Sequence, residues 1–346
     1  MSKADDIFIA MCKDIIENGT TTEGQEVRPK WPDGTPAYTI KQFGFCAKYD
    51  LREEFPVLTL RKTALKSAMD EILWIYQKKS NNIKDLKPHI WDEWADEDGS
   101  IGKAYGYQVQ RKFIHHIEKI SWNGIEEKYG SFNEYCMNLR RNGYQNRLID
   151  PIICGNRIIG ESVESFVYNN LADYNAEILN DYIFMDQMDS VLYDLKNNPF
   201  SRRIMINLWD IKDLNEMNLY PCCYNIIFNV TDEGQDKLVL NMTLNQRSND
   251  VLAANNWNVC QYALLLMMVA QVSNMIPGQL MHCITDVHIY DRHVDLVKEL
   301  ISRKTYPAPK VRLNPDIKDF YDFTMDDLIV EDYQYGPQIK DIPIAI

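Results

Sequence analysis

Two neighbouring segments in the later part of this 346-residue chain restrict the fold most, because they have the alternating pattern of paired strands. Residues 224–230 and 237–245 are separated by Thr-Asp-Glu-Gly-Gln, a sequence rich in turn formers. In the second segment Leu240, Met242 and Leu244 alternate with polar residues, which indicates one buried face. We therefore expect a hairpin within a sheet that is covered on one side.

A candidate nucleophile stands at the start of this hairpin. Cys222 lies just before the first strand, and Arg247 lies just after the second, so the hairpin brings the two side chains to one end of the sheet. Arg202 and Arg203 stand at the entry of an earlier strand. A free cysteine titrates near ~8.5 and needs nearby positive charge to react at neutral pH. A thiol among arginines indicates an anionic substrate.

Two further segments carry polar side chains in unusual positions. Asp286, His288 and Tyr290 alternate along a predicted strand and therefore share one face, where ionisable groups are poor core material. Asn258 precedes an apolar helix predicted over Val259–Ile276, and the plain interpretation of such an asparagine is an N-cap. The strand face is the stronger indication of a binding site.

Composition limits the kinds of partner. The net charge is -13, which argues against a general nucleic-acid or anionic-membrane surface, so an anion site has to be a local arginine pocket. The longest apolar run, Tyr262–Ala270, is too short to span a bilayer, and the N-terminus lacks a signal-peptide pattern. We expect a cytoplasmic protein with reduced thiols and no metal, because its eight cysteines show no metal-like spacing.

Several motifs occur together in one known family, in the same order and at similar spacing. They are Glu71–Trp74, Ile90–Ala95, Ala104–Gly106, Ser201–Arg203, Tyr220–Cys222, Gln246–Asp250, Asn258, Asp286–Tyr290 and Ile342–Ile346. Through these motifs the chain closely resembles the thymidylate synthases. The resemblance implies an α+β fold with a large mixed or antiparallel sheet packed with helices, in a sheet-to-sheet homodimer. It implies a single domain over residues 1–346, with an insertion at about 112–182.

The resemblance also implies a reaction and a role for each matching residue. It implies reductive methylation of dUMP to dTMP with methylenetetrahydrofolate, through a covalent bond from cysteine to C6 of uracil. The implied catalytic residues are Cys222, Glu71, Asp250 and Tyr105. The implied nucleotide-binding residues are Arg28, Arg247, Ser248, Asn258, His288 and Tyr290, with Arg202 and Arg203 supplied by the partner subunit. The implied folate-binding residues are Trp91, Trp94, Asp250, Trp257 and Ala345.

Taken without the resemblance, several of these residues have a plainer interpretation. Helices are predicted over residues 4–17 and 62–77, and Glu71 lies off the apolar stripe of the second, as a solvated glutamate would. Trp91 and Trp94 suit core packing as well as a ligand ring, and Arg28 suits a solvated loop.

The chain departs from the family pattern at several positions near the expected site. Cys223 replaces the usual histidine, Thr285 a glycine and Arg61 a lysine, and residues 252–257 differ from the usual sequence. These departures leave open a related activity, dUMP hydroxymethylase, in which water takes the place of hydride. The C-terminal Ala-Ile and the paired tryptophans favour reduction.

Two alternatives from other classes are weaker. A cysteine hydrolase would use Cys222 with His288, but the arginines fit phosphate better. A nucleotide-binding protein without catalysis would have no need of Cys222, Glu71 and Asp250. Within the insertion, residues 117–129, 135–140 and 163–171 look helical or mixed. Its adjacent histidines, at positions 115 and 116, point in different directions in any regular element and do not suggest a site.

Overall fold

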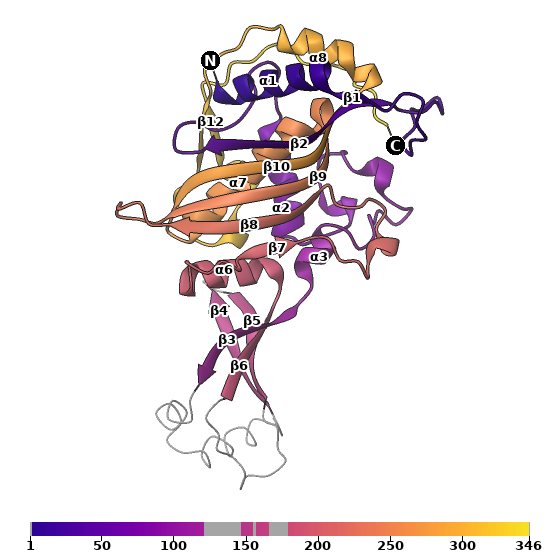
Figure 1. The fold of residues 1–346 in the computed structure, drawn as a ribbon. Coiled ribbons are helices and arrows are strands. Elements are labelled where there is room, and N and C mark those ends of the chain that lie inside the picture. The colour runs from indigo at the N-terminus through magenta and orange to yellow at the C-terminus, as the bar shows by residue number, and fades with distance from the viewer. Residues whose placement is uncertain (1, 121–146, 155–156, 166–178, 346) are drawn as a thin grey trace, which may run out of the picture. The chain divides into compact units, whose positions relative to one another are not determined.

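The structure is a computed structural model that describes residues 2–120, 147–154, 157–165 and 179–345. The chain divides into two compact units (Figure 1). The first unit comprises Met1–Val109 and Leu195–Ile346, and the second comprises Gln110–Asp194. Each unit is described by itself below.

A six-stranded mixed sheet forms the centre of the first unit. Its strands, in spatial order, are β1 (Thr20–Thr21), β2 (Thr39–Asp50), β10 (Ile276–Tyr290), β9 (Val239–Asp250), β8 (Cys223–Thr231) and β7 (Met205–Asn207). Strands β9 and β10 are parallel, and all other neighbours are antiparallel. The predicted hairpin is confirmed as β8 and β9, and the mixed sheet with its helices confirms the α+β class.

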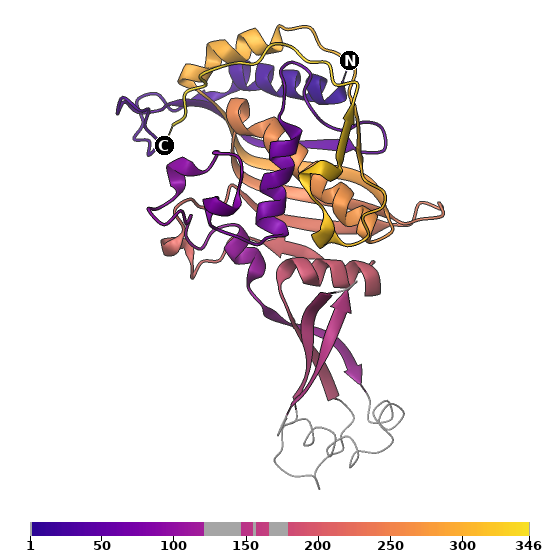
Figure 2. The same ribbon diagram turned by 180° about the vertical axis from the view of Figure 1, so that it is seen from behind.

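Two helices cover one face of this sheet, α2 (Leu65–Tyr76) and α7 (Asn256–Val272), as the two opposite views show (Figures 1 and 2). Helix α7 is buried almost all round, because its sequence from Val259 to Ala270 is nearly all apolar. It begins two residues before Asn258 and ends before Ile276, which belongs to β10. The N-cap interpretation of Asn258 is therefore wrong.

The other helices within the described residues are shorter or lie at the margin of the sheet. Helix α1 (Lys3–Asn18) confirms the predicted first helix, and with α8 (Val294–Ile301) it packs against buried residues of β10. Helices α3 (Gly106–Gln110) and α6 (Gln187–Asn197) lie where the two units meet in sequence. No helix among the described residues has both the length and the apolar character needed to cross a membrane.

Short elements complete the first unit. Strands β11 (Lys310–Leu313) and β12 (Leu328–Glu331) pair with each other. The single-turn helices are Ile83–Asp85, Asp92–Trp94, Leu214–Glu216, Asp291–His293, Phe320–Asp322 and Met325–Asp327, and a π-helical turn spans Val251–Asn255.

The second unit contains an antiparallel sheet in the order β3 (Phe113–Ile120), β6 (Leu179–Met185), β5 (Arg157–Ser165) and β4 (Arg147–Cys154). Strands therefore occupy residues 117–120 and 163–165, where helical or mixed structure was expected. The predicted stretch at 135–140 lies outside the described residues. The two adjacent histidines lie in β3, and their side chains are also outside what the structure describes.

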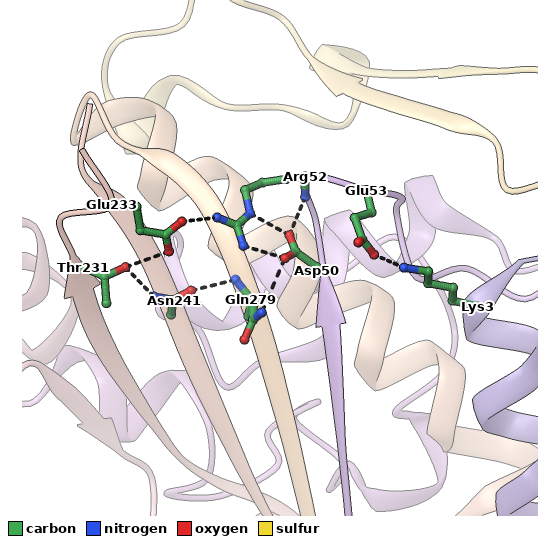
Figure 3. A network of polar contacts seen from close by, with 8 residues as sticks. All are labelled: Lys3, Asp50, Arg52, Glu53, Thr231, Glu233, Asn241 and Gln279. Atoms are coloured by element: carbon green, nitrogen blue, oxygen red, sulfur yellow. Dashed lines mark hydrogen bonds and ion pairs between the residues drawn. The ribbon is translucent and has the colours of Figure 1, made fainter. Parts of the chain in front are cut away.

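A polar network closes one end of the six-stranded sheet (Figure 3). Arg52, just after β2, donates to Asp50 at 2.6 Å and to Glu233, beyond β8, at 2.7 Å. The backbone N–H of Gln279 in β10 donates to the side-chain oxygen of Asn241 in β9 at 2.8 Å. Side-chain contacts thus bind together the ends of four strands.

The opposite end of the same strands carries the chemistry-bearing residues. The register pairs Cys223 at the start of β8 with Gln246, and it pairs Asp250 at the end of β9 with His288. Lys41, near the start of β2, lies opposite His288. The start of two strands and the end of two others therefore meet, as the sequence pattern predicted for the thiol and the arginine.

Candidate active site

Cys222 lies directly before β8, beside the guanidinium group of Arg247. Nη2 of Arg247 is 3.7 Å from the Cys222 sulfur, and it also donates to the carbonyl of Tyr220 at 2.9 Å. Nε of Arg247 donates to the carbonyl of Pro221 at 3.1 Å. Burial raises the pKa of the Cys222 thiol, and the positive charges of Arg247 and Arg28 oppose that rise. Backbone carbonyls thus hold the cation that stabilises the thiolate.

Tyr105 contacts the same cysteine although it is remote from it in sequence. Its hydroxyl accepts a hydrogen bond from the backbone N–H of Cys222 at 3.2 Å, and its ring contacts Trp91 edge to face at 5.0 Å. The φ angle of Tyr105 is 47°, a left-handed conformation that is uncommon for a bulky residue and concentrates at functional sites. The backbone is therefore held in a strained form that places this hydroxyl.

Glu71 is enclosed by two indoles. Nε1 of Trp91 donates to one carboxylate oxygen at 2.9 Å, and Nε1 of Trp257 donates to the other at 2.6 Å. Burial raises the pKa of Glu71 to about 7, although the indole hydrogen bonds favour the charged form. The interpretation as a solvated glutamate is wrong, since the residue is 6% exposed. Its carboxyl group is suited to exchange protons near neutral pH.

A chain of hydrogen bonds fixes the amide of Asn258. Its oxygen accepts from Nε2 of Gln246 at 3.0 Å, and its nitrogen donates to the oxygen of Gln261 at 3.1 Å. The oxygen of Gln246 lies 2.7 Å from Nε2 of His282. Burial lowers the pKa of His282 to about 3, so the ring is neutral and its Nε2–H donates. The buried side chains of His282 and Gln246, together with Gln261, thus determine the orientation of the Asn258 amide.

A second polar chain runs along β2 and β10. Nδ1 of His288 lies 2.8 Å from one oxygen of Asp286, and Nζ of Lys41 lies 2.9 Å from the other. Burial alone would raise the pKa of Asp286, but the contacts with His288 and Lys41 outweigh it, so the pKa is lowered. The ring of Tyr290 contacts His288 at 5.1 Å, and burial raises the pKa of Tyr290 to about 12. Tyr290 therefore keeps its proton at neutral pH.

Asp250 connects the end of β9 with the C-terminal tail. Its carboxylate accepts from the backbone N–H groups of Leu252 and Ala253 at 3.0 and 3.2 Å, and Nδ1 of His293 lies 3.4 Å away. Burial would raise the pKa of Asp250, but His293 outweighs it and the pKa is lowered. Nε2 of His293 lies 2.8 Å from the carbonyl of Pro343. This imidazole therefore joins the tail to the site.

These groups surround one cavity of about 950 Å³, built from residues of the first unit. Its walls contain nearly all the residues that the sequence indicated: Arg28, Glu71, Trp91, Trp94, Tyr105, Cys222, Arg247, Ser248, Asp250, Trp257, Asn258, His288, Tyr290 and Ala345. Arg202 and Arg203 do not line it and instead are exposed in the turn before β7. The volume is at the upper end of the range for small-molecule sites.

Comparison with known proteins decides the family. The family model described as thymidylate synthase matches residues 6–345. The chain belongs to the thymidylate synthase family. It is 36% identical over 343 residues to a thymidylate synthase of Bacillus licheniformis, and 35% identical over 343 residues to that of Bacillus subtilis subsp. natto, each match covering 98% of both chains. A solved structure, the thermostable thymidylate synthase A from Bacillus subtilis, matches over the whole of both chains with a TM-score of 0.74 and 34% identity.

Membership of this family gives the chain its activity class, a folate-dependent methyltransferase that acts on dUMP. The matched Bacillus relatives align over nearly their whole length, so the match extends across the segment at 112–182. That segment is therefore shared with these thymidylate synthases.

Two departures from the thymidylate synthase pattern have a clear structural setting. Cys223 is 5% exposed, and burial raises its pKa well above the usual value, so its thiol is poorly suited to act as a nucleophile. The guanidinium group of Arg61 donates to the carbonyl of Leu252 and does not line the cavity.

Four residues that line or support this site were not singled out by sequence reasoning: Lys41, Gln246, Gln261 and His293. Gln246 lies inside a recognised motif, so the motif pointed to it without giving a role. Asp286 was singled out only as part of a polar strand face, and the structure adds its contact with His288. Nothing in the local pattern distinguishes Lys41 or Gln261. They join the site only because β2 lies beside β10 and α7 lies beneath the cavity.

Proposed function

We propose that this enzyme makes dTMP from dUMP by adding the thiolate of Cys222 to C6 of the uracil ring. The observation that carries the proposal is the position of the Cys222 sulfur, 3.7 Å from Arg247 and in one cavity with Glu71. Addition at C6 pushes electrons toward C5 and O4, which makes C5 nucleophilic. A fixed cation beside the sulfur favours the thiolate that starts this step.

Nucleotide binding uses the polar walls of the cavity. Arg28, Arg247 and Ser248 supply cations and a hydroxyl to the phosphate oxygens. Asn258 presents an oriented amide to the uracil edge. His288 and Tyr290, which both line the cavity, hold the sugar hydroxyl.

Glu71 handles protons in this proposal. With a pKa of about 7, it is partly protonated at neutral pH and can either give or accept a proton through water. The indole hydrogen bonds from Trp91 and Trp257 fix the direction of both carboxylate oxygens. The carboxyl group is therefore placed to act without rearrangement.

The cavity also fits a reduced folate. Its volume exceeds the needs of a mononucleotide, and Trp91, Trp94 and Trp257 offer flat apolar surfaces to a ring. The side chain of Gln261 also lies in this wall, where it favours the charged form of Glu71 through a hydrogen bond. Methylenetetrahydrofolate, when bound, supplies the one-carbon unit and the hydride. Asp250 and the tail residue Ala345 complete this wall.

The same enclosure favours methylation over hydroxymethylation. Ile344 and Ala345 lie in the cavity wall, and the contact of His293 with Pro343 holds the tail there. A closed site excludes the water that a hydroxymethylase needs.

We further propose that the enzyme is a homodimer in which Arg202 and Arg203 serve the partner's phosphate site. Both residues are exposed and do not line the active-site cavity of their own first unit. Within the described part of that unit, the sheet face opposite α2 and α7 carries no helix (Figure 1). A second copy on this face would form the expected sheet-to-sheet contact.

The test is mass spectrometry after incubation with 5-fluoro-dUMP and methylenetetrahydrofolate. We expect a stable adduct on the peptide that contains Cys222, its loss in Cys222→Ser, and its retention in the matched variant Cys223→Ser. Product analysis with dUMP is expected to give dTMP together with dihydrofolate. An adduct that survives in Cys222→Ser would refute the proposed chemistry, and 5-hydroxymethyl-dUMP as the product would identify a hydroxymethylase.

A further inference from the structure

His293 is buried beside the active site, where each of its ring nitrogens faces an acceptor. Nδ1 lies 3.4 Å from the carboxylate of Asp250, and Nε2 lies 2.8 Å from the carbonyl oxygen of Pro343. The residue is 0% exposed, so water does not replace either acceptor. In a neutral imidazole one nitrogen carries no hydrogen. Either neutral tautomer therefore directs a lone pair at an acceptor, and only the protonated ring can donate to both.

Aromatic rings pack around His293 and also suit a protonated imidazole. Trp31, in the loop before β2, contacts it with ring centroids 5.7 Å apart, and Tyr290, at the end of β10, contacts it at 5.6 Å. Aromatic rings attract a nearby cation. The neighbouring cation Arg292 is 4.9 Å from the Trp31 ring and pairs with Asp33 at 2.7 Å. Its charge is therefore already matched by a carboxylate.

The titratable groups around the ring favour its charged form. Burial lowers the pKa of His293, but the carboxylates of Asp250 and Asp291 and the hydrogen bond to the tail carbonyl outweigh burial, so the pKa is raised above 6.5. On β10, Tyr290 keeps its proton at neutral pH, and the charge of His288 acts on Asp250. The geometry and the surrounding charges thus agree on an imidazolium.

The contact with Pro343 lies where the tail reaches the cavity. Ile339 and Ile342 pack against the apolar cluster that includes residues of α1, β10 and α8. Ile344 and Ala345, which follow Pro343, line the cavity. The tail after β12 forms no helix or strand over its described residues, so side-chain contacts of this kind hold it in place.

We propose that His293 is a pH-dependent positioning residue whose protonated ring holds the tail and Asp250 beside the cavity, and whose deprotonation releases the tail. A carboxylate is a stronger acceptor than a carbonyl, so the neutral ring keeps its hydrogen on Nδ1 and loses the contact with Pro343. A folded-state pKa above 6.5 means that this contact is fully present below pH 6.5 and is lost as pH rises through the higher value.

The inference rests on the proposed function, because it assigns the folate wall at Asp250 and Ala345 to one protonated group. We therefore expect the tail to be released, and KM for methylenetetrahydrofolate to rise, as pH increases above neutrality.

The first test uses the full-length enzyme without ligands, so that it does not depend on turnover. NMR of the protein with 15N-labelled histidine reports the charge of each of the six imidazoles. The signals of His293 are identified by their loss in His293→Asn. We expect both ring nitrogens to be protonated at pH 7 and the ring to titrate above 6.5. A ring that is neutral at pH 7 would overturn the proposal, and this measurement on the wild type decides the matter even if a variant does not fold.

Two variants separate the two ring contacts. The amide nitrogen of asparagine takes the place of Nδ1 and that of glutamine the place of Nε2, so His293→Asn keeps a donor for Asp250 and His293→Gln keeps one for Pro343. Intact-mass measurements follow the removal of Ile346 and Ala345 by carboxypeptidase Y. We expect His293→Asn to lose these residues about tenfold faster than the wild type at pH 6, and at a nearly equal rate at pH 9. His293→Gln should stay near the wild-type rate at pH 6 and should not change with pH in this way.

Steady-state kinetics connect the tail to catalysis. At pH 7, His293→Asn should raise KM for methylenetetrahydrofolate about tenfold, with kcat and KM for dUMP within about twofold, and His293→Gln should recover most of this loss. Equal digestion of the wild type and His293→Asn at pH 6, or equal defects in the two variants, would overturn the inference. A wild type that forms no adduct at Cys222 would refute the proposed function instead, and the NMR and digestion results do not depend on that adduct.

Discussion

Glu71 shows how a single residue acquires reactivity from its enclosure. The carboxylate receives hydrogen bonds from two indoles, and these favour the anion, but burial has the larger effect and moves its pKa to about 7. A carboxyl group that titrates at this pH spends comparable time as acid and as base. The balance between desolvation and hydrogen bonding thus determines the pKa of Glu71, and with it the ability of the carboxyl group to give or accept a proton near neutral pH.

Glu71→Gln removes this titration. We expect kcat for dUMP to fall by roughly 10²-fold or more, with loss of the inflection near pH 7 from the pH–rate profile. A raised pKa means that the folded state binds the proton more tightly, so Glu71 makes the wild type less stable as pH rises from about 5 to 7.

Denaturant titrations at several pH values check the stability part of this prediction. The free energy of unfolding of Glu71→Gln should increase relative to that of the wild type as pH rises across this window, so the variant becomes relatively more stable. A difference that does not change with pH would contradict the assigned shift.

Asp286 is placed to orient a neighbour. By holding Nδ1 of His288, it leaves Nε2 free for a sugar hydroxyl, and Lys41 holds Asp286 in turn. We expect Asp286→Asn to raise KM for dUMP about tenfold, equivalent to about 1.4 kcal/mol, with kcat almost unchanged. Lys41→Met should act in the same direction, and Lys41→Arg should restore the wild-type KM. Steady-state kinetics decide this, and a loss of kcat without a change in KM would refute the positioning role.

At the scale of elements, the two ends of the central sheet have different roles. One end gathers the reactive groups, while the other is closed by the polar network around Arg52 (Figure 3). The hydrogen bonds to Arg52 lower the pKa of Asp50 to about 2, although partial burial opposes this. These contacts hold the strands together at the end remote from the reactive groups.

Arg52→Ala should therefore affect stability and leave catalysis intact. We expect a loss of about 1 kcal/mol in the free energy of unfolding, because the ion pairs are partly exposed, and a smaller loss at high salt. A lowered pKa gives stability that is present above the unfolded value of 3.8 and is lost as pH falls toward 2, so the difference should shrink in acid. Lys3→Ala, which removes only an exposed ion pair with Glu53, is the matched control. A large fall in kcat would count against a structural role.

At the scale of the whole molecule, the chain enters and leaves the second unit through two neighbouring strands. Phe113 in β3 pairs with Met185 in β6, so the two backbone ends are roughly 5 Å apart. We predict that replacing residues 114–184 with a two- to four-residue linker keeps kcat/KM for dUMP within about threefold, because every residue that lines the cavity belongs to the first unit. Circular dichroism verifies folding of the shortened chain. A folded but inactive product would show that the segment takes part in catalysis.

The proposed dimer makes a prediction about mixtures. Cys222→Ser lacks the nucleophile, and the double variant Arg202→Ala with Arg203→Ala lacks the donated cations, so each alone should be nearly inactive. In a mixed dimer, one site receives an intact cysteine and intact arginines. Refolding the two variants together should therefore restore roughly one quarter of wild-type activity. If the mixture is no more active than its components, the arginines do not act across the subunit boundary.

The sequence by itself determined the hairpin, the long helices and the motif residues, because alternation, helical periodicity and motif order are local properties of the chain. Local periodicity alone misjudged the burial of Glu71 and the start of α7, since burial and helix capping depend on neighbours remote in sequence. Only the tertiary structure brought Lys41 to Asp286, His293 to Asp250 and Cys46 to Cys283. Such pairs form because of the register between strands and because segments remote in sequence fold back onto one another. A pKa or a sulfur contact depends on the distances that result, and no local sequence pattern contains them.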